Sequence, residues 1–348
     1  MKCLCIISQG YSIKKSVING FLTHNWEIKV VDFKSFFKHP INTFITKFEA
    51  APNKIKRHWK NPYINKINKV FLEIFEKEKP DLIFIYNNQN LLPDTVEKFS
   101  KKSKIAFMLG DNPLYTHTNI YNLQILNHAD YIICPDTFWL QQLKLLGINN
   151  LHFDCFSFDP EIYHPLDLSE EQKNKFSSDL AYIGLAHKSS WGYKRFLFLN
   201  QFANFNLKAY ISGDGYEKIW AESFPDLEKR IIKHNIIDQN FNNIVYNACK
   251  IAPIELVPSL FHGIHIRVFD VLGSRAFPLC EYSKDLDTLF LGLNIPFITN
   301  YAEANELARY LLSNDNYRQS LTEQMVERVE SIHRPKLVIG RMLKKIFK

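Results

Sequence analysis

The stretch SDLAYIGLAHKSSWGYKRFLFLNQFANFNLKAYISGDG, residues 178–215, decides the fold of this chain. An apolar run over 178–186 predicts a buried strand, residues 193–204 predict a helix, and residues 207–215 predict a second strand that ends in glycines. Because a helix separates the two strands, no tight hairpin can join them, and we expect them to run parallel in one sheet.

The same alternation of strands and helices runs through the rest of the chain. It predicts a parallel sheet covered by helices on both faces, and it predicts this twice. The other strands are expected at 2–8, 26–33, 81–87, 104–111, 129–135, 150–155, 248–258, 275–281 and 294–300. The other helices are expected at 12–23, 67–80, 92–101, 119–128, 137–146, 226–234, 266–272, 302–312, 316–332 and 336–347.

A loop rich in Asp, Pro and Ser at 159–171 divides the elements into two halves of similar size. We therefore predict an α/β protein of two doubly wound, Rossmann-like domains, which face each other across a cleft. Residues 1–165 form the first domain and residues 166–335 the second. Residues 336–348 are a basic helix that packs back towards the first domain.

The composition bounds the class of protein. Of the 348 residues, 46% are hydrophobic and 23% are charged, as in a folded globular protein with a sizeable core. No apolar run approaches the length of a membrane-spanning helix, and the N-terminus MKCLCIISQG lacks the pattern of a secretory signal. The six cysteines are scattered without the spacing of a zinc site, which favours core thiols in a reducing cytoplasm.

The net charge of +7 is unevenly placed. Between Lys34 and Lys69 there are eight Lys and one Arg against a single acid, Glu49, and aromatic side chains are interleaved with them. Such a segment can lie on an anionic membrane or grip a polyanion. Alternatively, it is a solvated helix and loop whose aromatic side chains pack inward. The sequence leaves both interpretations of residues 34–70 open.

A second stretch, HIRVFDVLGSRAFPLCEY at 265–282, carries charged residues into an apolar environment. Arg267 and Asp270 are three residues apart on the predicted helix, so they share one face. They could form a surface ion pair, or they could bind a charged ligand together. Because the flanking residues are more apolar than those of a solvated face, we favour the ligand.

With its upstream context, VPSLFHGIHIRVFDVLGSRAFPL at 257–279, this stretch resembles the nucleotide-sugar-binding half of GT-B fold glycosyltransferases. Pro258-Ser259 match the start of the group-1 motif, His262 and Asp270 stand at its two glutamate positions, and Gly273 stands near its helix glycine. The closer likeness is to the CgeB-like (spore maturation) glycosyltransferases. The motifs that fit that family are, in chain order, DLAYIGLA, Arg195, LKAYISGDG, Arg267, Phe269-Asp270 and RAFPLCEY. The likeness covers most of residues 80–345. His262 and the shorter Asp270 depart from its glutamates, which leaves the retaining or inverting course open.

This resemblance implies a site for a nucleotide-sugar donor in the second domain. A diphosphate needs fixed cations, and Arg267 and Arg195 supply guanidinium groups. Asp270 is placed to accept hydrogen bonds from ribose hydroxyls, His262 to contact phosphate or sugar, and Tyr246 to stack on the base. Glycines allow a close approach of the backbone to the donor. The donor-binding residues expected are Gly10, Gly184, Arg195, Gly213, Tyr246, His262, Arg267 and Asp270.

For the acceptor, the resemblance implies a site in the first domain. An inverting transfer needs a general base on the acceptor hydroxyl, and Asp111 in LGDNP is the candidate, with His117 in reserve. The residues Asp111-Asn112-Pro113 are equally consistent with a simple turn. No metal and no cofactor are expected, because the one Asp-x-Asp pair, Asp285 and Asp287, does not follow an apolar strand.

We therefore expect a cytoplasmic, bacterial glycosyltransferase of hexosyltransferase type. It would move a sugar from a nucleotide-sugar donor to a glycan, protein or lipid-linked acceptor without a metal. Contact of residues 34–70 with the inner face of an anionic membrane would be compatible with this activity. The alternatives are a non-catalytic nucleotide-binding protein on the same fold and a basic membrane-surface or nucleic-acid-binding protein.

Overall fold

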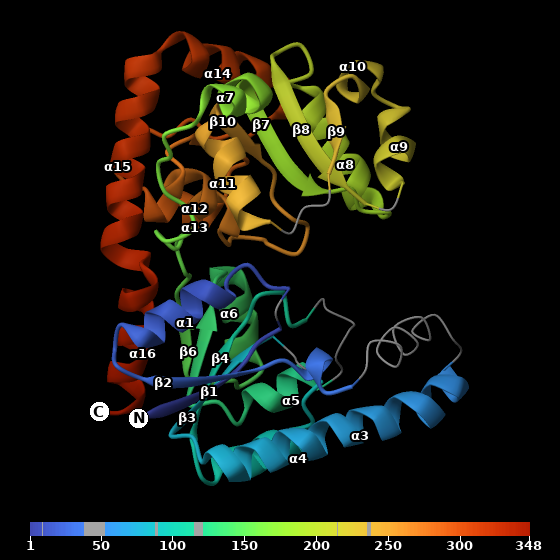
Figure 1. The fold of residues 1–348 in the computed structure, drawn as a ribbon, viewed down its shortest axis with the longest axis vertical. Helices are drawn as coiled ribbons and strands as arrows, with labels where there is room; N and C mark the ends of the chain where they lie inside the picture. Colours follow the sequence, from blue (N-terminus) through green and yellow to red (C-terminus); the bar gives the residue numbers. More distant parts are fainter. Residues whose placement is uncertain (9, 38–52, 88–89, 115–120, 214, 235–237) are drawn as a thin grey trace. The chain divides into compact units, whose positions relative to one another are not determined.

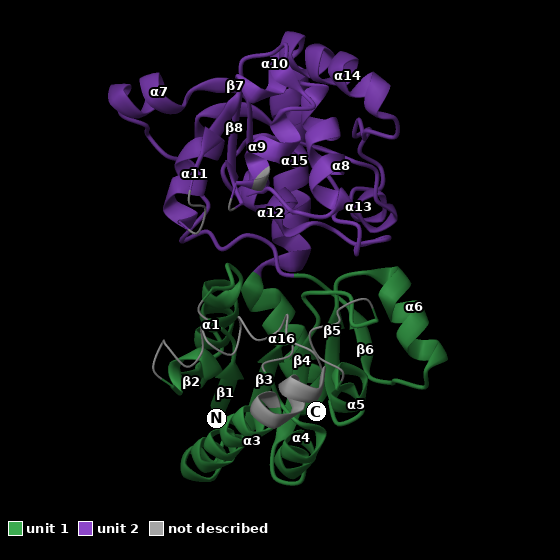
Figure 2. Cartoon of the chain, turned by 90° about the vertical axis from the view of Figure 1, so that its right-hand side faces the viewer, with its two compact units in different colours: residues 1–155, 335–348 green, residues 156–334 purple. Residues whose placement is uncertain are grey.

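The computed structural model of the chain describes residues 1–8, 10–37, 53–87, 90–114, 121–213, 215–234 and 238–348, with the backbone alone at 53–60 and at Tyr216. The chain divides into two compact units (Figures 1 and 2). Unit 1 contains residues 1–155 together with residues 335–348, and unit 2 contains residues 156–334.

Unit 1 is built around a six-stranded parallel sheet in the order β2-β1-β3-β4-β5-β6. Its four central strands, β1, β3, β4 and β5, are short apolar runs that are largely buried on both faces, as expected when helices cover a parallel sheet on both sides, whereas the edge strands β2 and β6 are partly exposed. The strands are β1 Lys2–Ile6, β2 Glu27–Val31, β3 Leu82–Tyr86, β4 Lys104–Met108, β5 Tyr131–Cys134 and β6 Leu151–Phe153. The helices are α1 Lys14–Leu22, η1 Phe33–Ser35, α3 Asn53–Glu78, α4 Pro93–Ser100, α5 Asn122–Leu126, α6 Thr137–Leu145 and α16 Pro335–Ile346.

Helix α16 belongs to unit 1 although it follows all of unit 2 in sequence (Figure 2). It packs against α1, where a Cβ atom added at Gly20 would lie 2.7 Å from Ile339 Cγ1. Arg341 of α16 donates hydrogen bonds from Nε and Nη2 to the buried carboxylate of Asp154 at 2.8–2.9 Å. A glycine contact and a bidentate ion pair therefore fix this helix onto the first sheet.

Unit 2 contains a five-stranded parallel sheet in the order β11-β10-β7-β8-β9. The strands are β7 Ser178–Leu185, β8 Leu207–Ser212, β9 Ile231–Lys233, β10 Cys249–Ile254 and β11 Phe277–Cys280. The helices are α7 Glu170–Phe176, α8 Ser190–Asn200, α9 Tyr216–Ala221, α10 Pro225–Glu228, α11 Gln239–Asn247, α12 Ile266–Gly273, α13 Lys284–Leu289, α14 Tyr301–Ser313 and α15 Asp315–His333.

The unit over 178–215 has the predicted form. β7 and β8 pair in parallel, with Leu180 opposite Leu207 and Ile183 opposite Tyr210, and α8 connects them. Both sheets are parallel throughout and carry helices between successive strands. The predicted fold class of two doubly wound, Rossmann-like α/β domains is therefore confirmed.

Two predicted elements are wrong, and several helices of unit 2 were not predicted. The helix expected at 226–234 is the short α10 followed by β9, because the β-branched Ile231 and Ile232 extend the sheet edge beside β8. The strand expected at 294–300 is reduced to one bridge between Glu281 and Ile298. Among the unpredicted helices are α7, which begins with the capping box of Ser169 and Gln172, α9 and α11.

The chain passes between the units at 155/156 and 334/335, whereas the sequence placed the boundaries at 165/166 and 335/336. Residues 156–165 belong to unit 2 because their side chains and backbone contact its elements. A Cβ atom added at Gly273 of α12 would lie 2.7 Å from the ring of Phe158 and 2.8 Å from Tyr163. The N–H of Ser157 donates to the carbonyl of His333 at 2.8 Å.

Candidate functional site

The candidate site of unit 2 is built around the start of α12. His265 caps this helix, since its Nδ1 accepts a hydrogen bond from the N–H of Arg267 at 3.1 Å. Val268, Phe269, Val271 and Leu272 face the core. On the opposite side Arg267 and Asp270 are only partly exposed, which gives the shared face that the i, i+3 spacing predicts.

A carboxylate that the sequence analysis did not single out lies at the centre of this region. Glu255 follows β10 directly and is completely buried. Its Oε1 lies 2.5 Å from Arg195 Nη2 and accepts from Arg195 Nε at 2.6 Å and from the Tyr182 hydroxyl at 3.0 Å. Its Oε2 lies 3.4 Å from Arg267 Nη1. Two guanidinium groups therefore share one buried carboxylate, which we call the Arg195–Glu255–Arg267 cluster.

The charges of this cluster do not cancel. Burial alone would raise the pKa of Glu255, but Arg195 and Arg267 outweigh it and hold that pKa well below its usual range. Burial also lowers the pKa of His187 to about 4 and takes the pKa of His265 well below its usual value, so both rings are neutral near pH 7. Within the cluster itself, two cations and one anion leave one uncompensated positive charge in a largely buried place; the carboxyl group of Asp270, which interacts electrostatically with Arg267, lies outside the cluster.

The two arginines differ in how far a ligand could reach them. Arg195 is 1% exposed, donates to the carbonyl of Leu185, and lies 5.0 Å from the ring of Trp191. The side chain of Arg267 is 15% exposed, and its other face lies 5.1 Å from the ring of Tyr182. Arg267 is therefore the guanidinium that can contact an incoming anion, while Arg195 holds Glu255 in place beside it.

Asp270 does not form an ion pair with Arg267 among the described residues, so the surface ion pair considered from the sequence is not what the structure contains. Burial raises the pKa of Asp270 to about 7, against the opposing effects of the neighbouring Tyr163 hydroxyl and of Arg267. The Tyr163 hydroxyl is itself buried, and no described residue partners it at hydrogen-bonding geometry. Asp270 is thus a carboxyl group that changes its charge near neutral pH.

The other predicted donor-binding residues lie in different surroundings. Tyr246 is 2% exposed, so neither ring face is open to a base. The space beside Gly184 and Gly213 is filled by neighbouring protein atoms. A Cβ added at Gly184 would lie 2.5 Å from the Tyr182 hydroxyl, and one added at Gly213 would lie 2.4 Å from the Ala186 carbonyl oxygen. His262 is partly exposed, and its carbonyl accepts from Ser283 Oγ at 2.6 Å.

Beside the Arg195–Glu255–Arg267 cluster lies a second charged group. Lys194 Nζ donates to Glu281 Oε2 at 2.8 Å and to the carbonyl of Leu256 at 2.9 Å, and the Tyr301 hydroxyl donates to Glu281 Oε1 at 2.5 Å. Leu256 N–H also donates to Glu281. This group ties the residue after Glu255 to the end of β11, which fixes the backbone from which Glu255 projects.

The candidate base lies in unit 1, where β3 and β4 end side by side. Asp111 follows β4 and is accessible to solvent. Its Oδ2 accepts from Asn87 Nδ2 at 2.8 Å, while Asn87 Oδ1 accepts from the N–H groups of Gly110 at 2.5 Å and Asp111 at 3.2 Å. Desolvation in this corner raises the pKa of Asp111, and the hydrogen bond from Asn87 opposes the rise. Gly10, also in unit 1, has open space where a Cβ would stand, and His117 lies outside the described residues.

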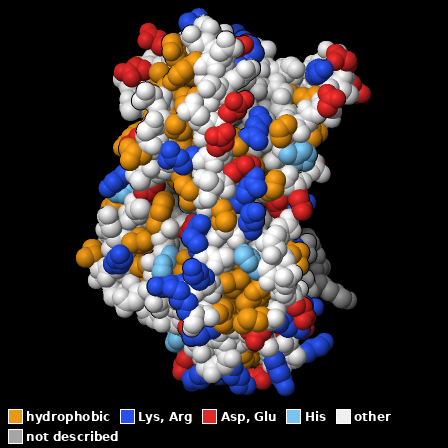
Figure 3. Space-filling model, turned by 90° about the vertical axis from the view of Figure 1, so that its left-hand side faces the viewer, with side chains coloured by type: hydrophobic (Ala, Val, Ile, Leu, Met, Phe, Trp, Pro, Cys, Tyr) orange, Lys and Arg blue, Asp and Glu red, His pale blue; other side chains and the backbone are white. Residues whose placement is uncertain are grey.

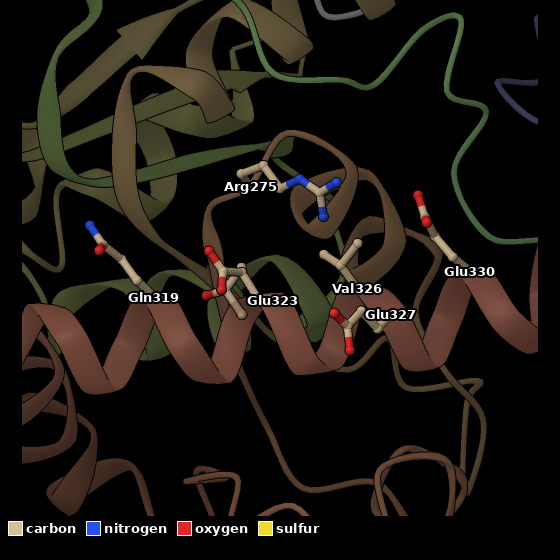
Figure 4. A pocket seen from close by; sticks show the side chains of 7 residues that line it. Arg275, Gln319, Glu323, Val326, Glu327 and Glu330 are labelled. Carbon is tan, nitrogen blue, oxygen red and sulfur yellow. The ribbon is translucent and has the colours of Figure 1, made fainter.

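A hollow of about 520 Å³ lies elsewhere in unit 2, against α15 (Figure 4). Arg275 points into it from the loop after α12, opposite Glu323, Glu327 and Glu330 of α15. Three carboxylates against one guanidinium repel a diphosphate. This hollow is therefore not the place for an anionic donor, in contrast to the surroundings of Arg267.

The membrane expectation rests mostly on residues that are not described. Residues 38–52 lie outside the described part of the chain, as do the side chains of 53–60. On the face shown in Figure 3, basic, acidic and apolar side chains are interspersed. Among the described residues, no helix has the length and apolar character needed to cross a bilayer, and no group of three or more His, Cys, Asp or Glu could hold a metal ion.

One family model matches most of unit 2 and most of α16. Residues 195–344, less than half of the chain, match the model of a family described as "Glycosyl transferase-like". This segment begins at Arg195 and contains Glu255, Arg267 and Asp270. No curated protein matches the sequence.

Several solved structures are similar over the whole chain. Sucrose-phosphate synthase from Thermosynechococcus elongatus has a TM-score of 0.71 at 12% identity, over 100% of this chain and 99% of that one. A glycosyltransferase from Rickettsia africae has a TM-score of 0.66 at 12% identity, over 100% and 98%. Anabaena HepE, in complex with UDP-glucose, has a TM-score of 0.63 at 14% identity, over 99% of both chains. At these identities the likeness shows the fold, which is that of GT-B glycosyltransferases, as predicted.

Proposed function

We propose that this chain is a glycosyltransferase that takes a hexosyl group from a nucleotide-sugar donor, and that it belongs with the CgeB-like enzymes. The observation that carries the proposal is the uncompensated positive charge of the Arg195–Glu255–Arg267 cluster. A buried net charge is unfavourable unless a counter-ion completes it, and the diphosphate of a nucleotide sugar is such a counter-ion. The match to the "Glycosyl transferase-like" model and the UDP-glucose bound to HepE support this choice of anion.

In the proposed reaction, Arg267 binds the diphosphate and stabilises the charge that develops on it as it leaves. No metal is required in this scheme, since the guanidinium supplies the positive charge. Asp270, three residues along the same helix face, accepts hydrogen bonds from the ribose. Glu255 holds Arg267 in place, and Arg195 balances Glu255 without touching the donor.

The acceptor hydroxyl is proposed to meet Asp111. Its O–H bond breaks as the proton passes to the Asp111 carboxylate, and its oxygen forms the new bond to the anomeric carbon. The bond from that carbon to the diphosphate oxygen breaks, and the nucleoside diphosphate leaves with the electron pair. This scheme inverts the anomeric centre. The acceptor is proposed to be a glycan, protein or lipid-linked sugar, with residues 34–70 at the inner face of an anionic membrane where the acceptor is a lipid.

The proposal is tested with a panel of nucleoside diphosphates and their sugars. UDP, GDP, CDP or TDP should raise the melting temperature, and one of the corresponding nucleotide sugars should be turned over. Arg267→Ala should remove both effects. Binding without any turnover or hydrolysis would indicate the non-catalytic nucleotide-binding protein instead. If no nucleoside diphosphate shifted the melting temperature at millimolar concentration, none of them would be the counter-ion of the cluster, and the proposal would be refuted.

A further inference from the structure

Asn87 has an unusual backbone conformation for a residue with a side chain. It follows β3 directly and has a φ of 53°, in the left-handed region that asparagine tolerates better than most residues. Its N–H donates to the carbonyl of Met108 in β4 at 2.9 Å. This conformation turns the amide side chain of Asn87 towards the end of β4, where Gly110 and Asp111 follow.

The amide is used at both of its ends. Oδ1 accepts from two successive backbone N–H groups, those of Gly110 and Asp111, and Nδ2 donates to Asp111 Oδ2 at 2.8 Å. One side chain therefore fixes the backbone of Asp111 and one oxygen of its carboxylate. Among the described residues, the other oxygen, Oδ1, has no hydrogen-bond partner.

The corner around this amide is closely packed. A Cβ atom added at Gly110 would lie 2.2 Å from the Tyr86 hydroxyl and 2.9 Å from Asn87 Nδ2, so any other residue there would force these side chains to shift. The Tyr86 ring in turn packs edge-on against Tyr11, with ring centroids 4.7 Å apart. The backbone that carries Asp111 is thus held by close contacts just beyond the ends of β3 and β4, and a group that must meet a substrate atom requires such a fixed position.

We propose that Asn87 is a positioning residue for Asp111, holding Oδ2 so that Oδ1 is presented to the acceptor hydroxyl. This inference rests on the proposed function, in which Asp111 takes the proton of the acceptor. Asn87 does not touch the substrate in this arrangement. It acts through the orientation of the carboxylate and through the hydrogen bond that favours its ionised form.

The test variant is Asn87→Gly, because glycine adopts a φ of 53° without strain and removes only the amide. The matched control is Asn25→Gly, which makes the same substitution at a φ of 60° in the turn after α1. In each protein the Asp111 carboxyl is titrated by NMR, with Asp111→Asn to assign its signal, and kcat is measured against pH. Asn87→Asp, which keeps the size of the side chain and adds a second carboxylate, serves if the glycine variant does not fold.

In Asn87→Gly, Asp111 should titrate at a higher pH than in the parent protein. The acidic limb of kcat against pH should move in the same direction, and kcat should fall roughly 10- to 100-fold with the donor KM unchanged, as for a misplaced catalytic group. Asn25→Gly should leave all three unchanged. An unmoved Asp111 titration in Asn87→Gly, or a lower kcat with an unmoved acidic limb, would overturn the positioning role.

The two arms separate this inference from the proposed function. The NMR titration needs no turnover, so it decides whether Asn87 holds the Asp111 carboxylate even if no sugar is transferred. If Asp111→Asn kept the full kcat, the base assignment would fail, and the positioning role in catalysis would fail with it. If Asp111 titrated at a higher pH in Asn87→Gly while Asp111→Asn kept the full kcat, Asn87 would hold the Asp111 carboxylate without any role in catalysis.

Discussion

Glu255 Oε2 lies 3.4 Å from Arg267 Nη1, inside unit 2, and this pairing takes the place of the Arg267–Asp270 ion pair that the sequence left as the alternative to a ligand site. Because Arg195 shares the same carboxylate, Glu255 is the single negative charge between two guanidinium groups. The behaviour of unit 2 should therefore depend strongly on Glu255, and the binding of anions on Arg267.

Replacing Glu255 by Gln should lower the stability of the protein by about 3–5 kcal/mol, because two buried guanidinium groups would lose their shared counter-charge. Urea unfolding of the variant measures this loss. The control is Asp226→Asn, which removes a carboxylate from an exposed pair with Lys229 and should cost less than about 1 kcal/mol. Equal losses in the two variants would mean that Glu255 is not the balancing charge.

Arg267→Ala should weaken the binding of the preferred nucleoside diphosphate at least about 10-fold, as expected for the loss of a charge-assisted hydrogen bond. Calorimetric titration with UDP, GDP, CDP and TDP measures the affinities. Arg309→Ala removes an arginine from α14 that bonds Asn305 and should leave the affinities unchanged. A uniform small loss in both variants would point to a general charge effect instead of a contact at Arg267.

Asp270→Asn should flatten the dependence of stability on pH between about 4 and 7. The pKa of Asp270 is raised to about 7 from an ordinary value of 3.8, so the folded protein binds the proton more tightly than the unfolded chain does. The stabilisation is present below pH 4 and is lost as the pH rises through 7. It amounts to on the order of 2–4 kcal/mol.

The measurement for Asp270 is the difference in unfolding free energy between the parent protein and Asp270→Asn at several pH values. The parent protein should lose stability relative to the variant as the pH rises over this range. A constant difference across the range would show that Asp270 titrates normally.

Arg341→Gln should destabilise unit 1 by about 1–3 kcal/mol, since the buried carboxylate of Asp154 would lose its bidentate partner. The melting temperature of the variant measures this. Lys344→Gln, a neutralising change on the same helix with no such partner among the described residues, should leave the melting temperature nearly unchanged. If the two variants melt together, the ion pair does not anchor α16.

The fold could be predicted because the apolar runs of the strands and the helices between them are local patterns. The buried parallel strands are short runs rich in Ile, Leu, Phe and other apolar residues, and helices connect successive strands, so no distant contact is needed to recognise them. The failures have the same explanation. Residues 226–234 carry both helix-favouring and β-branched side chains, and only the free edge of β8 decides that Ile231–Lys233 is a strand.

The candidate site could be predicted only in part, because its contacts are distant in sequence. The face shared by Arg267 and Asp270 follows from their spacing. Glu255, however, pairs with Arg195 sixty residues away, which no local pattern reveals. The sequence did contain one signal, because Glu255 ends the mostly apolar run CKIAPIE. A carboxylate that is buried with such a run needs a cation as its partner, so a partner for Glu255 could have been expected. The contact of Asn87 with Asp111 was harder to predict, because it depends on the left-handed φ of Asn87, which the sequence does not reveal.

The membership of α16 in unit 1 sets the order in which the molecule can be completed. A ribosome makes every residue of unit 2 before it makes the helix that covers Gly20 and neutralises Asp154. The first sheet to be synthesised is consequently the last to be finished, and until then its α1 surface stands open to water. A chain interrupted near residue 334 would contain all of unit 2, whereas its unit 1 would lack the helix that packs against Gly20 and pairs with Asp154.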